Sequence, residues 1–363
     1  MRLSVGRNVY LAALAVLLAA SAAYPCTTFV LDNGGKPVFG RNYDWYLEDG
    51  LVVANQRGVE KTAAFLEDPK GPPARWTSKY GSITFDQVGR EFPCGGMNEA
   101  GLVVEVMIVL FPWQTKPDSR PVITNMQWIQ CQLDKYATVA EVVAHAGDLR
   151  IRQEAGVPMH YLIGDASGDC AAIELVRGEI VCHRGADQPN RVLTNDNYRR
   201  ARTRMLRWAA DNPVADPPEG IGSMPRFIRT CKRVAEFVPC DQSGTLDYAF
   251  ATLKNANMGK LTVWSIVYDI AVRRVYFRTQ SRPALRYVDL SGFDFSCGGP
   301  VKVLDIKADL AGDVTGKFTD YTEEANRKLV SAAFDAVWYI RHHRAKAMEL
   351  LVPYPETTVC AEK

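Results

Sequence analysis

Apolar and polar side chains alternate from Thr27 to Leu31, and this period of two predicts a β-strand. An Asp32-Asn33-Gly34-Gly35 turn follows, and the chain resumes with Val38-Phe39-Gly40-Arg41. An Asn-Gly pair between two such runs is a strong hairpin signal. Because residues that flank a tight turn pair symmetrically, we expect Cys26, at the start of the first strand, to lie near Arg41 on the second.

Further strand and helix patterns interleave along the rest of the chain. Many of the strand segments are joined by short Gly or Asp turns, which favours antiparallel sheets: 102–110, 161–164, 172–176, 180–183, 191–194, 261–268 and 275–278. Helical patterns cover 127–136, 138–146, 199–210, 226–237, 245–255 and, in one long stretch, about 322–350. Since helices are needed on sheet faces, we predict one layered α+β domain over residues 26–363.

The pattern before this domain is typical of a secretory signal. Two arginines precede an apolar run from Val9 to Ala20, and small residues follow. We therefore expect a signal peptide over 1–23, a short propeptide at 24–25, and a periplasmic or secreted protein. The run is shorter than the roughly 20 apolar residues that span a bilayer, so no stable membrane anchor is expected.

Composition and charge exclude several classes of partner. The chain has 363 residues, 47% hydrophobic and 23% charged, which is ordinary for a globular protein. Its 43 basic and 41 acidic residues become 41 and 41 once Arg2 and Arg7 are removed with the signal. This balance lacks the positive charge that nucleic acids demand, so no nucleic acid partner is expected.

The cysteines and histidines do not indicate a metal site. The five histidines do not fall at metal-ligand spacing with the nine cysteines, so no metal or organic cofactor is expected. Besides Cys26 there are eight cysteines, an even number that allows disulfides in an oxidising compartment without fixing their connectivity.

The residues around Cys26 predict a nucleophile. If the chain is cut before Cys26, that residue carries both a thiol and a free α-amine, whose ordinary pKa near 7.7 suits a general base. The guanidinium of Arg41 is placed to stabilise the thiolate. A carboxylate at Asp44, just beyond the second strand, is placed to hold the protonated amine or to accept the substrate amide N–H.

Several segments resemble a known enzyme family. Cys26-Thr27-Thr28-Phe29-Val30 and Gly40-Arg41-Asn42-Tyr43-Asp44-Trp45 resemble the amino terminus of the choloylglycine hydrolase and penicillin V acylase family. Gly96-Met97-Asn98-Glu99-Ala100-Gly101-Leu102 and Val192-Leu193-Thr194-Asn195 resemble two further motifs of that family. The resemblance implies an αββα four-layer sandwich of antiparallel sheets and an N-terminal-nucleophile amidase in which Cys26 attacks the carbonyl.

The resemblance also implies roles for three further residues. The oxyanion would be held by the side-chain amide of Asn195 and by a group at Asn98, where preorganised donors stabilise the charge that develops on the carbonyl oxygen. Arg226 would support the nucleophile. The chain departs from the family at Asp196-Asn197-Tyr198, which lacks the usual proline. Only thirty residues separate Asn195 from Arg226, where some members carry a long assembly hairpin, so a homo-oligomer stays open.

The expected substrate is a small N-acyl amide. Tyr43 and Trp45 beside the nucleophile, and Trp113 after a strand with Phe111 and Pro112, are candidates for an apolar acyl site, since binding pockets are largely apolar. The competing interpretation is that these aromatic residues pack in the core. Penicillin V, conjugated bile salts and N-acyl homoserine lactones are the candidate substrate types for hydrolysis of a linear, non-peptide C–N amide bond.

Two other functions stay open at this point. The first is an exported, disulfide-stabilised binding or scaffold protein in which Cys26 is half of a disulfide. The second is an acid-ceramidase-like N-acyl amidase or acyltransferase, because Gly40-Arg41-Asn42 resembles that group as well. The redox state of Cys26 separates the first from an amidase, and product analysis with an added amine separates the second.

Overall fold

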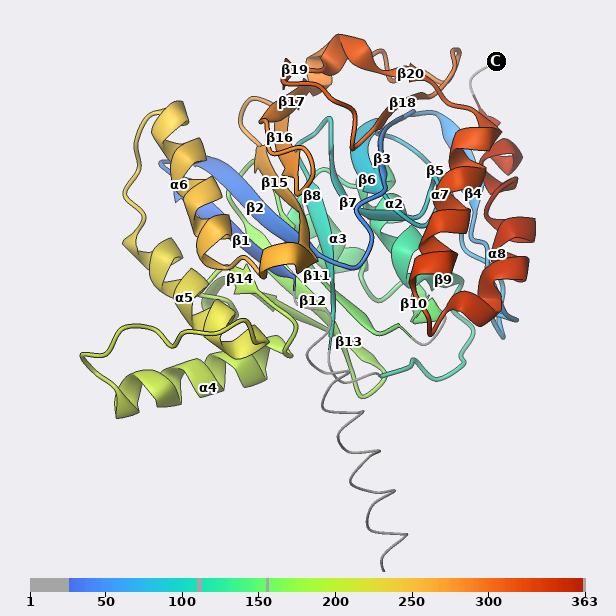
Figure 1. The fold of residues 1–363 in the computed structure, drawn as a ribbon. Coiled ribbons are helices and arrows are strands. Elements are labelled where there is room, and N and C mark those ends of the chain that lie inside the picture. Colours follow the sequence, from blue (N-terminus) through green and yellow to red (C-terminus); the bar gives the residue numbers. More distant parts are fainter. Residues whose placement is uncertain (1–25, 110–112, 155–156, 362–363) are drawn as a thin grey trace, which may run out of the picture.

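The computed structural model describes residues 26–109, 113–154 and 157–361 (Figure 1). The expected signal peptide and propeptide lie outside these residues, as do Phe111 and Pro112. Among the described residues, no helix has the length and apolar character needed to cross a membrane.

Two large sheets dominate the part of the chain that the structure describes. The first has seven strands, in the order β14 (Val192–Leu193), β1 (Thr27–Asn33), β2 (Lys36–Asp44), β15 (Thr262–Asp269), β16 (Arg274–Thr279), β17 (Arg286–Asp289) and β19 (Gly312–Asp313). The second has nine, in the order β13 (Glu179–Arg184), β12 (Cys170–Val176), β11 (Met159–Gly164), β8 (Val103–Ile108), β7 (Pro93–Asn98), β6 (Ser82–Asp86), β3 (Leu51–Asn55), β18 (Lys302–Asp305) and β20 (Thr319–Asp320). Apart from β17 with β19, neighbouring strands in both sheets pair antiparallel.

The remaining elements are helices and two small sheets. The small sheets are β9 (Val122–Thr124) with β10 (Arg150–Arg152), and β21 (Val359–Cys360) with β4 (Val59–Thr62) and β5 (Arg75–Thr77). The α-helices are α2 (Asn125–Lys135), α3 (Val139–His145), α4 (Tyr198–Asp211), α5 (Ser223–Glu236), α6 (Gln242–Asn255), α7 (Glu323–Ala336) and α8 (Arg344–Leu350). Short 3₁₀ turns lie at Gly185–Asp187, Gly259–Leu261, Leu290–Gly292, Thr315–Lys317, Arg341–His343 and Tyr354–Thr357.

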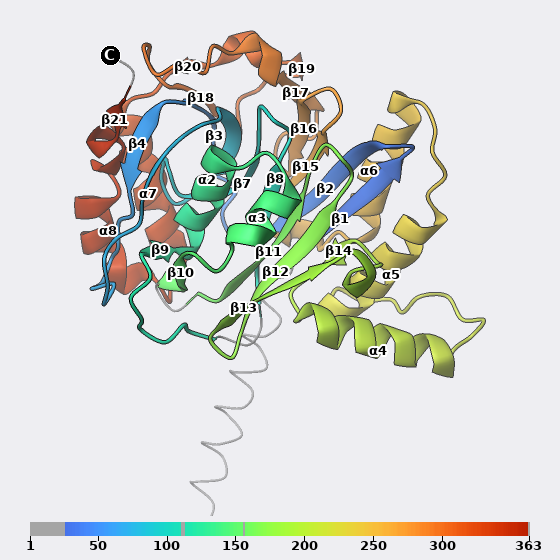
Figure 2. The same ribbon diagram turned by 180° about the vertical axis from the view of Figure 1, so that it is seen from behind.

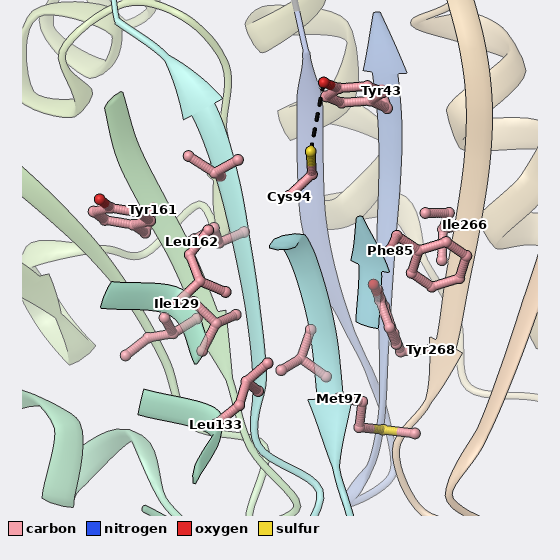
Figure 3. Packing of buried hydrophobic residues seen from close by; sticks show 14 of the residues in the cluster. Tyr43, Phe85, Cys94, Met97, Ile129, Leu133, Tyr161, Leu162, Ile266 and Tyr268 are labelled. Atoms are coloured by element: carbon pink, nitrogen blue, oxygen red, sulfur yellow. Dashed lines mark hydrogen bonds between the residues drawn. The ribbon is translucent and has the colours of Figure 1, made fainter. Parts of the chain in front are cut away.

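The sheets and helices stack in four layers. Helices α5 and α6 pack on β1, β2 and β15 of the first sheet, and α2 packs on β7 and β8 of the second (Figures 1 and 2). Between the sheets, Phe85 of β6 makes edge-to-face contacts with Tyr268 and Phe277 of the facing sheet. Figure 3 shows this layer together with Ile129 and Leu133 of α2 on the outer side. The prediction of an αββα sandwich is confirmed.

The first hairpin forms as its sequence predicts. Thr27 faces Asn42 and Thr28 faces Arg41, so the start of β1 lies beside the end of β2. Gly34 and Gly35 make the turn with φ values of +62° and +80°, which glycine adopts at little steric cost. The register brings Cys26 next to the β2 residues that follow Arg41.

The long helix expected over 322–350 is wrong. Helix α7 ends at Ala336, where Val337 leaves the helical conformation (φ −103°, ψ 100°), and α8 begins only at Arg344. The intervening Val337-Trp338-Tyr339-Ile340 is rich in β-branched and aromatic residues, which are weak helix formers. Val337 and Ile340 of this segment are buried, at 1% and 7% exposure.

The carboxyl-terminal segment is fixed to the rest of the domain by a strand pairing and a disulfide. Strand β21 pairs with β4, and Cys360 of β21 forms a disulfide with Cys297. Cys26 is a free thiol in the structure, so the alternative in which it is half of a disulfide is not what the structure shows. The other free cysteines of the described residues are Cys94, Cys131, Cys170, Cys182, Cys231 and Cys240.

Candidate active site

Cys26 lies directly before β1 and is almost completely buried, with 4% of its surface exposed. The backbone N–H of Asp44, on the neighbouring strand, donates to its sulfur. Burial raises the pKa of the Cys26 thiol, and the positive charges of Arg41 and Arg226 oppose that rise. The thiol is therefore positioned for chemistry and needs a base to become a thiolate.

Arg41 lies near Cys26, between strands β7 and β8 at the point where they separate. Its guanidinium is fully buried and forms an ion pair with Glu105 of β8. It also donates to the carbonyl oxygen of Cys94 on β7 (2.7 Å) and to that of Val106 on β8 (3.0 Å). Pairing between β7 and β8 stops at Gly95 and Glu105. Arg41 thus satisfies carbonyl groups that lose their strand partners where the two strands part.

A largely apolar pocket opens where the strands part. We call it the nucleophile pocket; it holds about 990 Å³ of empty space, part of it open to solvent. We call the part lined by Cys26 and Asp44 the polar end, and the part lined by residues of α7 and of the segment after it the apolar end. Further lining residues include Tyr43, Trp45, Gln87, Phe92, Cys94, Met107, Ile108, Asn125, Met126, Glu154, Met159, Phe334, Val337 and Ile340.

Asp44 supplies a buried carboxylate beside the sulfur. The Thr262 hydroxyl donates to one of its oxygens, Oδ1, and Oδ2 has no hydrogen-bond partner among the described residues. Burial raises the pKa of Asp44 to about 7, against the lowering effect of Arg226, Thr262 and Arg41. A positive group next to Oδ2 would return this carboxyl to its ionised form at neutral pH.

Arg226 joins the backbone of Cys26 to the side chain of Asn195, and neither Arg226 nor Asn195 is among the pocket-lining residues. Arg226 Nη1 donates to the carbonyl oxygen of Cys26 (2.6 Å), and Nη2 donates to Oδ1 of Asn195 (2.9 Å). Because Arg226 takes the oxygen of the Asn195 amide, the nitrogen Nδ2 points to Ile108, whose carbonyl it meets at 2.8 Å. Burial lowers the pKa of Arg226 to about 10, which leaves it charged at neutral pH.

Comparisons with known proteins show the family of this chain. The family model of the linear amide C–N hydrolases, choloylglycine hydrolase family, matches residues 26–222. The chain belongs to this family. The match begins at Cys26, the residue that the sequence singles out as the nucleophile.

Individual relatives are also similar over most of their length. A penicillin V acylase of Pectobacterium atrosepticum is 27% identical over 343 residues, covering 82% of this chain and 89% of the relative. The structure of a penicillin V acylase from Agrobacterium tumefaciens superposes with a TM-score of 0.71 at 24% identity, covering 82% of this chain and 98% of that one. A conjugated bile acid hydrolase from Clostridium perfringens, at 14% identity, has a TM-score of 0.63 and covers 79% and 98%.

Asn98 does not take the place expected from the resemblance. It ends β7 on the far side of Gly95 from the pocket, and it is not among the pocket-lining residues. Its Nδ2 donates to the carbonyls of Leu133 (2.8 Å) and Tyr136 (2.7 Å), and its Oδ1 accepts from the N–H of Leu102. The amide is fully used in fastening α2 to the β7–β8 turn, so it cannot serve an oxyanion at Cys26.

The aromatic candidates divide between two places. Tyr43 and Trp45 line the nucleophile pocket of this choloylglycine hydrolase family member, and the Tyr43 hydroxyl donates to Gln87 (2.7 Å) and contacts the Cys94 thiol (Figure 3). Trp113 is 42% exposed and lines a separate hollow beside Glu174 of β12. The expectation that Trp113 contacts the acyl group at Cys26 is therefore wrong for this structure.

Sequence reasoning missed Glu105 and Ile108. Glu105 interrupts the apolar run Val103-Val104-Glu105-Val106-Met107, and an acidic residue inside a buried strand needs a positive partner. An acidic residue in this position therefore predicts a buried basic partner, and in the structure that partner is Arg41. Ile108 acts through its backbone, which leaves no trace in the residue type.

Proposed function

We propose that the protein is an exported amidase whose mature form begins at Cys26. In this proposal it hydrolyses the linear amide bond of small N-acyl compounds, with the acyl group in the nucleophile pocket. The observation that carries the proposal is the position of the free Cys26 thiol, at the polar end of an apolar pocket and close to Asp44 and the two buried arginines. One of these arginines, Arg226, holds the Asn195 amide.

The first chemical step is attack by sulfur. The α-amine of a mature Cys26, with an ordinary pKa near 7.7, takes the thiol proton, and the thiolate attacks the amide carbonyl. The nearby positive charge of Arg41 favours the thiolate. The resulting ammonium is a suitable partner for Oδ2 of Asp44, and it would lower the pKa of that carboxyl from its raised value of about 7.

Two donors are available for the oxyanion. Nδ2 of Asn195 lies beside Ile108. Ile108 faces Met159 in the β8–β11 register, and the N–H of Val109 donates to Pro158. Because hydrogen-bonded and non-bonded pairs alternate in an antiparallel ladder, the N–H of Ile108 points away from β11, to the side where β7 has parted from β8. Both groups would donate to the tetrahedral oxygen.

The remaining steps complete hydrolysis. The ammonium of Cys26 returns its proton to the leaving nitrogen, the C–N bond breaks, and an acyl thioester remains on Sγ. The α-amine then takes a proton from water, hydroxide adds to the thioester carbonyl, and the acid leaves as the thiol is restored. Acyl transfer to an added amine in place of water would instead indicate an acyltransferase.

The apolar pocket supports an apolar acyl group. Its lining includes Trp45, Met126, Phe334 and Val337, with a smaller number of polar residues such as Asp44, Gln87, Asn125 and Glu154. The similar proteins include penicillin V acylases and a bile acid hydrolase, which suggests phenoxyacetyl and bile-acid amides as first substrates to test. N-acyl homoserine lactones supply the matching linear aliphatic series. Export to the periplasm or medium, and assembly into a homo-oligomer, are parts of the proposal to be tested separately.

The decisive experiment measures processing and turnover together. Intact mass and amino-terminal sequencing of the secreted protein should place the first residue at Cys26, and the substrate panel should be turned over by that form. Cys26→Ala should abolish turnover, whereas Cys131→Ala, at another buried free cysteine, should keep it. Full activity with residues still attached before Cys26 would defeat the proposal.

A further inference from the structure

A buried histidine lies between two hydrogen-bond acceptors at the edge of the sandwich. His160, on β11, has no exposed surface. Its Nδ1 lies 3.0 Å from Oε1 of Glu174 on the neighbouring strand β12. Its Nε2 lies 2.8 Å from the backbone carbonyl oxygen of Thr194, which follows β14 in the other sheet. The side chain therefore links the two sheets.

The two contacts together define the protonation state of the ring. A backbone carbonyl accepts and never donates, so Nε2 must carry a proton. A carboxylate also only accepts, so Nδ1 must carry one as well. Burial raises the pKa of Glu174, but the hydrogen bonds from His160, His183 and the Tyr198 N–H, together with the charge of His160, lower it overall to about 2. Glu174 is thus ionised at neutral pH. Only an imidazolium at His160 can donate to both Glu174 and the Thr194 carbonyl.

The rest of the Glu174 carboxylate is also fully engaged. His183 lies 3.1 Å from Oε2, Asn197 Nδ2 donates to Oε2 (2.7 Å), and the N–H of Tyr198 donates to Oε1 (3.0 Å). Asn197 and Tyr198 begin α4, directly after the turn that carries Asn195. Glu174 therefore holds the residues that follow that turn and, through His160, the Thr194 carbonyl that precedes it.

The opposite side of the turn is held by α5. The hydroxyl of Ser223 accepts from the N–H groups of Asn195 (3.1 Å) and Asp196 (3.0 Å), and Arg226 fixes the Asn195 side chain. Thr194 contributes its carbonyl to His160 and its hydroxyl to Ser223, which lies at 3.0 Å. The peptide that follows Thr194 is thus clamped between the sheet edge and α5.

We propose that His160 is a positioning residue, held as an imidazolium by Glu174, which fixes the Thr194 carbonyl and so aims the amide of Asn195 at the reacting carbonyl. The inference rests on the proposed function, because it assigns Asn195 to the oxyanion. Loss of one ring proton removes one of the two hydrogen bonds of His160, so the ring no longer connects the Thr194 carbonyl to Glu174, although Glu174 still holds Asn197 and Tyr198. The titratable groups around His160 are Glu174 and His183, with Asp196 and Arg226 beyond the turn.

The protonation state is tested without turnover. In mature Cys26→Ala protein labelled with ¹⁵N, the ring nitrogens of His160 should both carry protons at about pH 7.5, because each faces an acceptor. The signals are assigned by their loss in His160→Gln or, should that variant not fold, by elimination with variants of the other four histidines. A neutral His160 at that pH overturns the inference.

The positioning role is tested by kinetics. His160→Gln should lower kcat by roughly tenfold with KM nearly unchanged, a smaller loss than removal of an oxyanion donor itself. His183→Gln is the matched control, because it contacts the same carboxylate but not Thr194, and it should change kcat less than about twofold. Equal losses in the two variants would overturn the positioning role.

A third measurement separates an effect on the position of Asn195 from an effect on the reactivity of Cys26. Alkylation of Cys26 by iodoacetamide forms no oxyanion on an amide carbonyl, so its rate should be the same in wild type and His160→Gln. A parallel fall in alkylation would contradict the inference, since it would show that the whole site has loosened. If the wild type hydrolyses no amide, the proposed function fails, while the ¹⁵N measurement still decides the state of the His160 ring.

Discussion

One end of the nucleophile pocket holds Cys26 among Asp44, Arg41 and Arg226, whereas the other end is lined by apolar residues of α7 and the segment after it. The polar end is built mostly from residues inside 26–222, which the family model matches. Helix α7 lies about a hundred residues beyond that match. We therefore expect the shared sandwich to carry the chemistry and α7 to contribute to the choice of acyl group.

The two ends also differ in what holds them. At the polar end, buried charges are fixed by ion pairs and by hydrogen bonds to backbone carbonyls, so removal of one group leaves others unsatisfied. At the apolar end, Phe334 and Val337 contribute surface and shape only. Substitutions at the polar end should therefore cost stability or catalysis steeply, whereas those at the apolar end should shift substrate preference.

The largest effect is expected at Arg41. Arg41→Met leaves Glu105 charged and buried without its ion-pair partner, and it leaves the Cys94 and Val106 carbonyls unpaired. We expect the free energy of unfolding, measured by urea titration, to fall by about 3–5 kcal/mol. Lys302→Met, which removes the exposed Lys302–Asp320 pair, should cost no more than about 1 kcal/mol. Similar losses in both variants would contradict this account of the polar end.

Asparagine substitutions should separate catalysis from stability. Asn195→Ala removes a proposed oxyanion donor and should lower kcat by about 10²–10³-fold. Asn98→Ala should leave kcat of the folded enzyme nearly unchanged and instead lower stability by about 1–3 kcal/mol, because the Leu133 and Tyr136 carbonyls and the Leu102 N–H lose their partner. The two are compared by steady-state kinetics and thermal unfolding. A large kcat defect in Asn98→Ala would restore the role that the resemblance implied.

Glu174 should make stability depend on pH in the acid range. Its pKa, raised by burial but lowered overall to about 2 by its hydrogen bonds, lies below the unfolded value of 4.5, so the unfolded chain binds more protons between these values. The contribution is present above about pH 4.5 and is lost as the pH falls to about 2. We expect wild type to lose about 3 kcal/mol more than Glu174→Gln between about pH 6 and pH 2. Parallel curves for the two proteins would show that Glu174 contributes nothing.

The smallest effect is expected at the apolar end. Phe334→Ala enlarges the pocket and should lower kcat/KM about tenfold for the acyl group that reaches furthest, with little change for the shortest. Leu329→Ala is the control, because Leu329 is also a buried residue of α7 but packs with Leu51, Val53, Val301 and Val303, away from the pocket. An equal loss across the whole acyl series would mean that α7 does not select the acyl group.

Much of the polar end could be predicted from the sequence because it depends on local patterns. The Asn-Gly turn fixes the register of β1 and β2, and that register brings Cys26 and Asp44 together. Asn195 and Arg226 were identified by resemblance, and the structure brings both to the backbone of Cys26 and its neighbours. Their catalytic roles stay predictions until the variants are measured.

What the sequence missed depends on contacts between distant segments. The motif at Asn98 is a turn signal, and only the packing of α2 shows that its amide is used by Leu133 and Tyr136. The break after Ala336 falls at Val337-Trp338-Tyr339-Ile340, where weak helix formers interrupt the helical pattern and Val337 and Ile340 line the pocket. No local motif marks His160, because its partners come from other parts of the chain. Glu174 lies on β12, and Thr194 follows β14.

The parting of β7 and β8 around the Arg41 guanidinium also bears on how substrate enters and leaves. The two strands that part stay paired with their other neighbours, β7 with β6 and β8 with β11, so this side of the pocket has a rigid frame. Entry would then be limited by side-chain rotations at the mouth, on a far faster timescale than domain closure. A larger pocket would accordingly be obtained by moving the point at which the pairing of β7 with β8 ends, without adding a hinge.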